Sequence, residues 1–377
     1  MSIRSTLKKE GISVIGQLNT FEVNKIASNI SEKICKAFPE HNINQSDLFI
    51  SISRLNMYIA DMTKDRALAK YFFKNNSIYF NKSIDFNNLG TLAIHECIHF
   101  MQELRNKNGK LIRFGLYDME GKNHGMAINE ASVQLMASIA NGEPLDTVKY
   151  YNLELTTESP DYYPIETALL RQLIYFTGSY PLFHSTLNSN DVFRNTFIEK
   201  SNAKTYNKIE SNMDLIMHYE EKLNSASTKL AYLSEDANNH IAKLKKLNGE
   251  IDALKELIFN ITLETQNTIL VECFNKQFEN IRTLNDIKKF QSDLYNFKTV
   301  TINTGNYNFY NEYYCDMMTK LDEKREFLEK YGDILTYESL NKELSLIEED
   351  GFGFQFFKKL FNKLSLLTEE FFRAKEY

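Results

Sequence analysis

The sequence predicts an α+β protein whose first half mixes strands and helices and whose second half is helical. Two observations predict this division of the 377 residues. All five prolines lie within the first 181 residues, and because proline interrupts helix interiors and central strands, the rest of the chain is free to form long helices. A hydrophobic heptad repeat then runs through residues 216–261 of the proline-free part.

Composition is that of an ordinary globular chain, with 43% hydrophobic and 25% charged residues. The formal net charge of −6 gives no electrostatic reason to expect nucleic acid or an anionic membrane as a partner. The first residues lack the apolar stretch of a signal peptide, and no run of 18 apolar residues predicts a transmembrane segment. We therefore expect a cytoplasmic protein, with leaderless export or delivery left open.

The four cysteines are scattered along the chain without paired spacing. At this chain length a disulfide scaffold is not expected, and a reducing compartment is the simpler interpretation.

Three segments in the first 85 residues have recognisable periodicity. Glu22–Phe38 has apolar residues at helical spacing and predicts an amphipathic helix. Leu48–Ile59 alternates well enough to predict a strand followed by a turn. Ser77–Ile84 is rich in β-branched and aromatic residues and predicts a short strand.

Two helices are expected after these segments. The first covers Leu89–Leu104, with Asp85 or Asn87 as its N-cap. Four glycines between positions 106 and 125 then predict an irregular connection. The second helix covers Met126–Ala140 and ends at the Asn-Gly pair that follows.

The heptad repeat predicts a coiled coil. Its a and d positions are apolar except for one histidine, His240, which we interpret as a tolerated polar or register-setting residue: Ile216, Tyr219, Leu223, Ala226, Leu230, Leu233, Ala237, His240, Leu244, Leu247, Ile251, Leu254, Ile258 and Ile261. As one uninterrupted helix this segment would be on the order of 70 Å long. Such a helix needs a partner, either a later helix of this chain or a second copy.

The remaining residues are also mostly helical in pattern, with a less regular patch at Thr299–Tyr310. Gly353–Ala374 is amphipathic, with phenylalanines crowding one side, and is more typical of core than of a membrane anchor. Three regions follow: a catalytic domain over 1–200, the coiled-coil helix over 201–262, and an all-α C-terminal region over 263–377.

The residues that carry chemistry are His95, Glu96 and His99, a His-Glu-x-x-His pattern on the helix predicted over Leu89–Leu104. Histidines at i and i+4 lie on one helix face and reach one zinc ion, whereas Glu96 is rotated away and is available as a general base. The flanks from Leu92 to Met101 are uncharged, as a buried helix requires. Cys97 points away from the histidines and is expected to be a small packing residue.

A catalytic zinc needs a third protein ligand. Metzincins would have glycine and histidine where this chain has Gln102 and Arg105, so that arrangement fails. Two candidates follow downstream, His124 in the glycine-rich connection and Glu130 on the next predicted helix. Glu130 is favoured because a carboxylate on an apolar helix face is costly unless it is paired or metal-bound, although a salt bridge to lysine would also explain it.

His95-Glu96-x-x-His99 followed by Asn129-Glu130 on a second helix resembles the gluzincin clan of zinc metallopeptidases, over roughly residues 45–140. The resemblance implies a zincin-like domain in which two active-site helices lie beneath a small mixed sheet. It also implies that Ser77–Ile84 is the edge strand that binds extended peptide. Thermolysin-like members have aspartate where this chain has Gln134, whose carbonyl could still accept a histidine ring N–H.

Gluzincins supply a donor for the oxyanion from a residue downstream of the third ligand, and five residues are candidates by order alone: Tyr162, Tyr163, Arg171, Tyr175 and His184. The expected function is a Zn²⁺-dependent metallopeptidase acting on a protein or peptide, with Glu96 as general base. The alternatives are a coiled-coil scaffold with a residual zinc site and a hydrolase of a non-peptide amide. Self-association or partner binding through the coiled coil also stays open.

Overall fold

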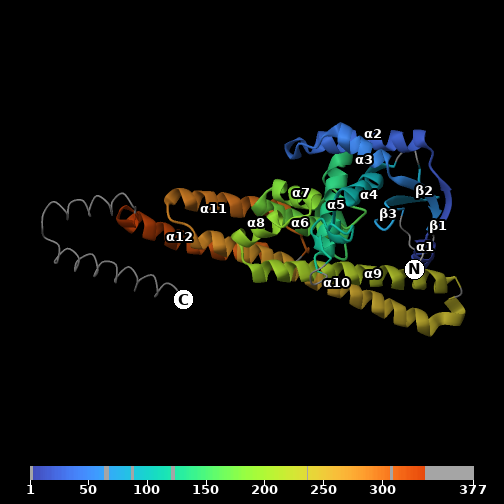
Figure 1. The fold of residues 1–377 in the computed structure, drawn as a ribbon. Helices are drawn as coiled ribbons and strands as arrows, with labels where there is room; N and C mark the ends of the chain where they lie inside the picture. The colour runs from blue at the N-terminus through green and yellow to red at the C-terminus, as the bar shows by residue number, and fades with distance from the viewer. Residues whose placement is uncertain are drawn as a thin grey trace. The chain divides into compact units, whose positions relative to one another are not determined.

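The computed structural model describes residues 3–62, 68–85, 89–119, 124–235, 237–305 and 309–335, without the side chains of 237–239 and 331–335 (Figure 1). The described chain divides into two compact units. The first contains the residues up to Glu279 together with Asp293–Tyr314, and the second contains Asn280–Ser292 and the residues from Cys315 onward. The first unit mixes helices with three small sheets, so the predicted α+β class is compatible with the structure.

The N-terminal part forms a four-stranded mixed sheet with the order β1-β2-β4-β3. Strand β2 is antiparallel to β1 and parallel to β4, and β3 is antiparallel to β4. The elements of this part are α1 (Ile3–Lys9), β1 (Ser13–Gln17), α2 (Thr20–Ala37), the 3₁₀ helix η1 (Pro39–His41), α3 (Gln45–Ser53), β2 (Asn56–Asp61), β3 (Ala69–Phe72) and β4 (Ser77–Asn81). The helix predicted over Glu22–Phe38 is thus confirmed as α2.

The strand predicted over Ser77–Ile84 is confirmed as β4, but its expected place at the sheet edge is wrong. β4 lies between β2 and β3, and all five of its residues are buried. A strand whose consecutive residues Ile78, Tyr79 and Phe80 are all largely apolar is typical of a strand covered on both faces, not of an exposed edge. The edge strands are β1 and β3, and β3 follows a segment outside the described residues.

The strand predicted over Leu48–Ile59 is wrong in its first half. That part is the helix α3, and only Asn56–Asp61 is a strand. Leu48 and Ile52 are four residues apart and are both buried on one face of α3. The side chain of Asn44 accepts the backbone N–H of Asp47 and caps the helix, a signal stronger than the short alternation of apolar residues.

The two expected active-site helices are α4 (Gly90–Met101) and α5 (Met126–Asn141). α4 begins after Leu89, so the N-cap expected at Asp85 is wrong, and Asn87 lies outside the described residues. α4 also ends earlier than predicted, because the chain turns into the short sheet of β5 (Glu103–Arg105), β6 (Leu111–Phe114) and β7 (Tyr117–Asp118). Gly142 has a positive φ of 77° and ends α5, as the Asn-Gly pair predicts.

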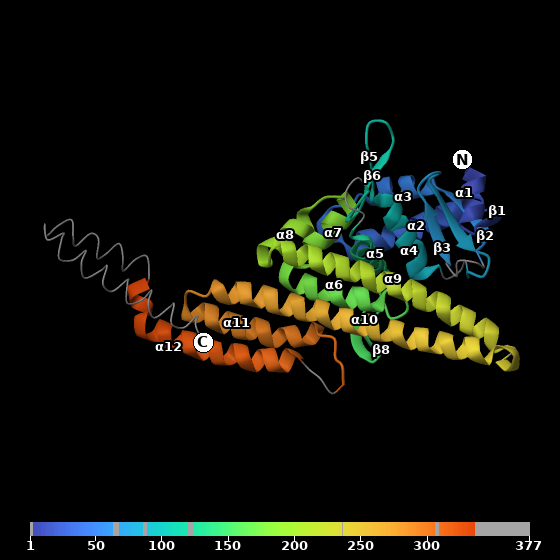
Figure 2. The same ribbon diagram turned by 90° about the horizontal axis from the view of Figure 1, so that it is seen from below.

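The predicted single coiled-coil helix is wrong, because the chain reverses direction. The heptads are divided between α9 (Ala203–Ser234) and α10 (Ala237–Glu279), two long helices that pack side by side in both views (Figures 1 and 2). His240 has non-helical backbone angles, φ −129° and ψ 16°. Buried a and d residues occur in both arms, for example Ile216 and Leu223 in α9 and Leu254 and Ile258 in α10. Each of the two helices needs a stripe of apolar a and d residues to pack against the other, so the heptad pattern occurs on both sides of the reversal.

The rest of the first unit connects α5 to this helical hairpin and packs against it. Its elements are the β8–β9 hairpin (Asp146–Tyr150 and Leu153–Thr157), α6 (Pro164–Thr177), α7 (Ser179–Asn188) and α8 (Val192–Lys200). α9 packs against α5, and α10 packs against α6. The hairpin therefore covers α5 and α6, the two helices that follow α4 in the chain.

The C-terminal described elements are α11 (Leu284–Phe297), the 3₁₀ helix η2 (Lys298–Val300) and α12 (Phe309–Leu335). The less regular patch at Thr299–Tyr310 is confirmed where it is described, between η2 and α12. The amphipathic segment Gly353–Ala374 lies outside the described residues. No helix in the described part of the chain is long and apolar enough to cross a membrane. All four cysteines are unpaired.

Candidate metal centre

His95 and His99 lie one turn apart on α4, and both are 7% exposed. The helix is buried because its uncharged flanks pack on both sides. Ala93, Ile94, Cys97 and Ile98 are all buried, and burial raises the pKa of the Cys97 thiol, so Cys97 is an inert packing residue as expected. The two imidazoles are therefore directed away from the sheet side and toward α5.

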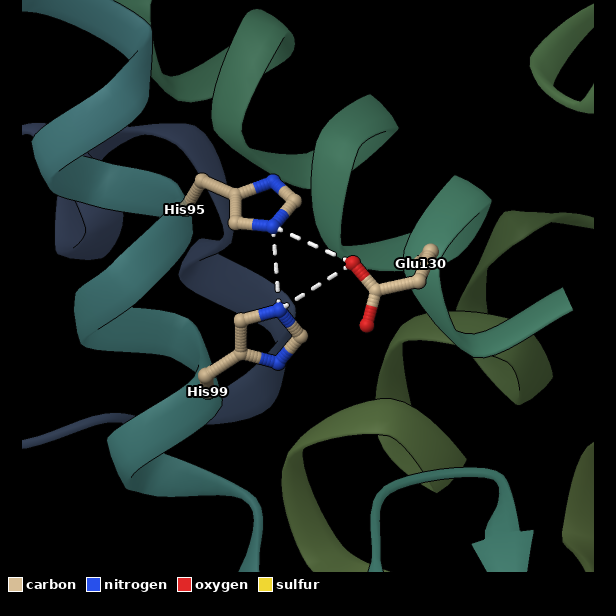
Figure 3. Close-up of side chains that lie close together, drawn as sticks. All are labelled: His95, His99 and Glu130. Carbon is tan, nitrogen blue, oxygen red and sulfur yellow. Dashed lines mark hydrogen bonds and ion pairs between the residues drawn. The ribbon is translucent and has the colours of Figure 1, made fainter. Parts of the chain in front are cut away.

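Glu130 of α5 faces both histidines (Figure 3). Its Oε2 atom lies 3.4 Å from the Nε2 atom of His95 and 3.4 Å from that of His99. The two Nε2 atoms are 2.9 Å apart. Ligand atoms about 2.1 Å from one tetrahedral ion would lie about 3.4 Å from each other. The two distances to Glu130 match this spacing, and the two Nε2 atoms lie closer together than it requires. The buried His95/His99/Glu130 group could hold a metal ion.

The other candidate for the third ligand is elsewhere. The Nδ1 atom of His124 lies 3.9 Å from the carboxylate of Asp214, and 53% of the His124 side chain is exposed. Asp214 itself caps α5 from α9, since its two oxygens accept the backbone N–H groups of Gly125 and Ala127 at 2.8 Å each. The helical hairpin thus holds the start of the helix that carries Glu130.

Two glutamines hold the outer nitrogens of the histidines. His95 Nδ1 lies 2.9 Å from Oε1 of Gln134, the contact that the resemblance to gluzincins allowed, and His99 Nδ1 lies 3.0 Å from Oε1 of Gln102. An amide oxygen can only accept, so each Nδ1 carries the proton and each Nε2 presents its lone pair to the site. Such partners orient metal-binding histidines and make them better ligands.

The Nε2 lone pairs of His95 and His99 and the Glu130 carboxylate are all electron donors that face one another, so a cation between them would be favourable. Burial disfavours a charged His99, but the Glu130 carboxylate outweighs burial and raises the pKa of His99 to about 9. Burial also opposes the charge on Glu130, yet the two histidines lower the pKa of its carboxyl. A proton meets this demand in the metal-free protein, and a divalent ion would meet it for all three groups.

Glu96 is turned away from the three-residue cluster toward the sheet. Its Oε2 atom accepts the backbone N–H of Tyr71 on the edge strand β3, and its side chain is nearly buried. The hydroxyl of Tyr71 donates to Glu103 at 2.8 Å, which fixes the strand against the end of α4. The side chain of Glu96 is therefore held at the edge strand β3, next to the three-residue cluster but not part of it.

Of the five candidate oxyanion donors, only Tyr163 lies at the cluster. Its ring centroid is 6.5 Å from that of His95, with 14° between the ring planes. Burial, and then the carboxylates of Glu130, Glu166 and Glu96, hold the pKa of Tyr163 well above its usual value, so the group remains a neutral hydrogen-bond donor.

The other four candidates are engaged elsewhere or exposed. Tyr162 is 38% exposed. Arg171 is paired with Glu158, the hydroxyl of Tyr175 donates to the backbone carbonyl of Asp293, and His184 stacks on Tyr180.

Sequence reasoning missed several residues that shape the site. Gln102 served only to exclude the metzincin pattern, yet it holds His99. Phe114 of β6 stacks on His99, with ring centroids 5.0 Å apart. Asn129 was noticed only as the neighbour of Glu130, although its position next to a candidate ligand on a buried helix was a usable signal. No sequence pattern pointed to Asp214, because its contact with the start of α5 forms only when α9 packs against α5.

Comparisons with known proteins add nothing to this geometry: no protein-family model, curated protein or solved structure matches the chain.

Proposed function

We propose that this protein is a zinc-dependent metallopeptidase of the gluzincin type. The observation that carries the proposal is the separation of roles around α4: His95, His99 and Glu130 converge on one point, while Glu96 is held beside them by the β3 backbone. Two imidazoles and one carboxylate form the ligand set of many catalytic zinc sites and leave a coordination position open. When bound, zinc supplies Lewis acidity that polarises a carbonyl and lowers the pKa of water.

In this proposal each residue has one task. Glu96 accepts a proton from the attacking water and later returns it to the leaving amine. Tyr163, kept as a neutral phenol, donates a hydrogen bond to the oxyanion that develops on the scissile carbonyl. Gln134 and Gln102 keep the Nε2 lone pairs of the two histidines directed at the site. The substrate is a peptide or protein segment, although another amide would meet the same chemistry.

The alternative of a scaffold acting through the heptad seam has less support. The buried seam residues of α9 face the other arm of the same hairpin, so they do not present an unpaired surface.

The test compares the wild type with Glu96→Gln and, as a matched surface control, Glu143→Gln, whose side chain contacts Thr91 and Asn141. We expect one zinc per chain in all three proteins by elemental analysis. A peptide mixture analysed by mass spectrometry should be cleaved by the wild type and the control but not by Glu96→Gln. Absence of stoichiometric metal in the wild type, or unchanged cleavage by Glu96→Gln, would overturn the proposal.

A further inference from the structure

Two glutamates that the proposed reaction does not use, one fully buried and one partly buried, face each other beside Tyr163. Glu166 is the third residue of α6 and is 0% exposed. Glu220 lies on α9, and the two carboxyl groups are within hydrogen-bonding reach of each other. The pair therefore joins the first turn of α6 to the helical hairpin.

No cation neutralises this pair among the described residues. In the described part of the chain, the two oxygens of Glu166 and Oε1 of Glu220 accept no hydrogen bond from another residue's N–H group or hydroxyl. Neither glutamate forms an ion pair with a described lysine, arginine or histidine. The titratable groups that face the pair are the phenols of Tyr150 and Tyr151, at the turn between β8 and β9, and the phenol of Tyr163. These phenols are neutral themselves, because burial raises the pKa of all three.

Two carboxylates cannot hydrogen-bond to each other, because both are acceptors only. If one carboxyl keeps its proton, the same two groups form an O–H···O⁻ bond, which is short and strong. Burial raises the pKa of Glu166 and of Glu220, and the adjacent Glu166 carboxylate raises that of Glu220 further. The pair therefore retains one proton where an exposed glutamate would have lost it.

Tyr163 depends on the same turn of α6. It occupies a left-handed backbone conformation, φ 51° and ψ 44°, which is unfavourable for a bulky residue. Two hydrogen bonds hold the Tyr163 backbone in this conformation. The Tyr163 carbonyl accepts the backbone N–H of Thr167 at 2.9 Å and the Thr167 hydroxyl at 2.9 Å. Since strained positions persist only where their surroundings fix them, the anchoring of this turn decides where the Tyr163 ring lies.

We infer that Glu166 and Glu220 are positioning residues that share one proton, and that this proton fastens the first turn of α6 to α9 and so holds Tyr163 against the metal centre. When bulk base removes the proton at alkaline pH, two buried carboxylates repel, the turn separates from α9, and Tyr163 leaves His95. The shared proton rests on the contact between the two carboxyl groups, the burial of Glu166 and the missing donors, whereas its consequence for catalysis rests on the proposed function of Tyr163.

The shared proton is tested by infrared spectroscopy of the wild type. We expect the C=O band of a buried protonated carboxyl at neutral pH, its loss as the pH is raised, and its absence from Glu220→Gln and Glu166→Gln. Glu221→Gln, which removes the exposed neighbour of Glu220, should retain the band. A wild-type spectrum without the band, or with a band that both pair variants keep, would overturn the inference.

The coupling to Tyr163 is tested in a Tyr163→Trp background. The chain contains no other tryptophan, so the fluorescence reports on this position alone. We expect a fluorescence transition at the pH where the infrared band disappears, none in Glu220→Gln, whose amide donates to Glu166 at every pH, and an unchanged transition in Glu221→Gln. Flat fluorescence while the band titrates would show that the pair does not position residue 163.

If the tryptophan variant does not fold, hydrogen exchange of the backbone amides of residues 163 and 165–167 in the wild type and in Glu220→Gln makes the same comparison. None of these measurements uses substrate or bound metal. A failure of the inference is therefore distinguishable from a failure of the proposed peptidase activity.

Discussion

The backbone N–H of Leu116 donates to Oδ1 of Asn129 at 3.0 Å. Through Asn129 and then Gln102, this bond determines the tautomer of His99, a candidate metal ligand. Because a backbone N–H must donate, the atom it meets on Asn129 is the oxygen. Gln102 then donates its Nε2 to that oxygen at 2.9 Å and turns its own oxygen to His99 Nδ1. The short sheet after α4 thereby determines which nitrogen of His99 faces the metal centre.

Removing the middle of this network should weaken metal binding without unfolding the protein. For Gln102→Leu we expect zinc affinity to fall about 10–100-fold, the usual effect of losing a partner that orients a metal-binding histidine. Competition with a chromophoric chelator measures it. Gln172→Leu is the control, since Gln172 is equally buried but donates to Gln266 and not to the cluster. Equal zinc affinity in both variants would contradict the role of Gln102.

The identity of the third ligand is tested by a pair of alanine variants. Glu130→Ala should lose stoichiometric zinc, because two buried histidines alone leave the ion without its anionic ligand. His124→Ala should keep zinc, because His124 is half exposed and lies beside Asp214. Elemental analysis after dialysis against buffered zinc distinguishes them. Loss of zinc from His124→Ala with retention by Glu130→Ala would reverse the assignment.

Gly115 should tolerate no side chain. It has a φ of +60°, and a Cβ atom there would overlap Gln102 Nε2 and Asn129 Oδ1. We expect Gly115→Ala to lower the free energy of unfolding by roughly 1–2 kcal/mol, because alanine is unfavourable in the left-handed conformation. The added Cβ atom should also displace Gln102 and Asn129, which orient His99. Gly109→Ala is the matched control: its φ is +74°, but a Cβ atom there meets nothing within 4 Å. Urea unfolding should show both variants destabilised, and zinc titration should show weakened binding in Gly115→Ala alone.

Tyr163→Phe should reduce turnover while leaving metal content unchanged. Removing one oxyanion donor costs about 10²–10³ in kcat, and KM should change little because the bond forms mainly in the transition state. Tyr162→Phe provides the control, as Tyr162 is its exposed neighbour. Kinetics on a peptide cleaved by the wild type measure the effect. A large change in KM with kcat unchanged would instead make Tyr163 a ground-state binding residue.

The Glu166–Glu220 pair should make stability fall as the pH rises. Both pKa values are raised in the folded protein by burial, so above the ordinary glutamate range the folded state holds a proton that the unfolded state has lost. The contribution of the pair is complete below the unfolded pKa. It then declines by about 1.4 kcal/mol per pH unit for each proton that the folded pair retains and the unfolded chain has lost, until the folded pair is fully ionised.

Urea unfolding at several pH values measures this slope. Glu220→Gln should flatten it, whereas Glu221→Gln, which alters an exposed carboxylate on the same helix, should keep it. A parallel slope in the wild type and in Glu220→Gln would mean that other groups cause the pH dependence.

Local patterns predicted the elements that depend on near neighbours. The amphipathic helix α2, the strand β4 and the helix α5 with its glycine stop were all found from spacing and turn chemistry. The edge position expected for β4 and the N-cap expected at Asp85 were wrong, and two larger failures have a clear physical cause. A short apolar segment around Leu48 satisfied both a strand and a helix pattern, and the heptad repeat could not reveal the reversal after Ser234, because the two arms of a hairpin need the same seam.

The sequence by itself determined the two histidines and the glutamate between them, because i and i+4 on a helix share a face wherever the helix lies. It favoured Glu130 over His124 but did not decide between them. Only the tertiary structure brings Glu130, and not His124, close to the two histidines. The cap from Asp214 sets where α5 begins, and α9 supplies this cap from 84 residues beyond Glu130. Tyr163, Gln102 and the Glu166–Glu220 pair likewise acquire their places from contacts between distant segments, which no local periodicity encodes.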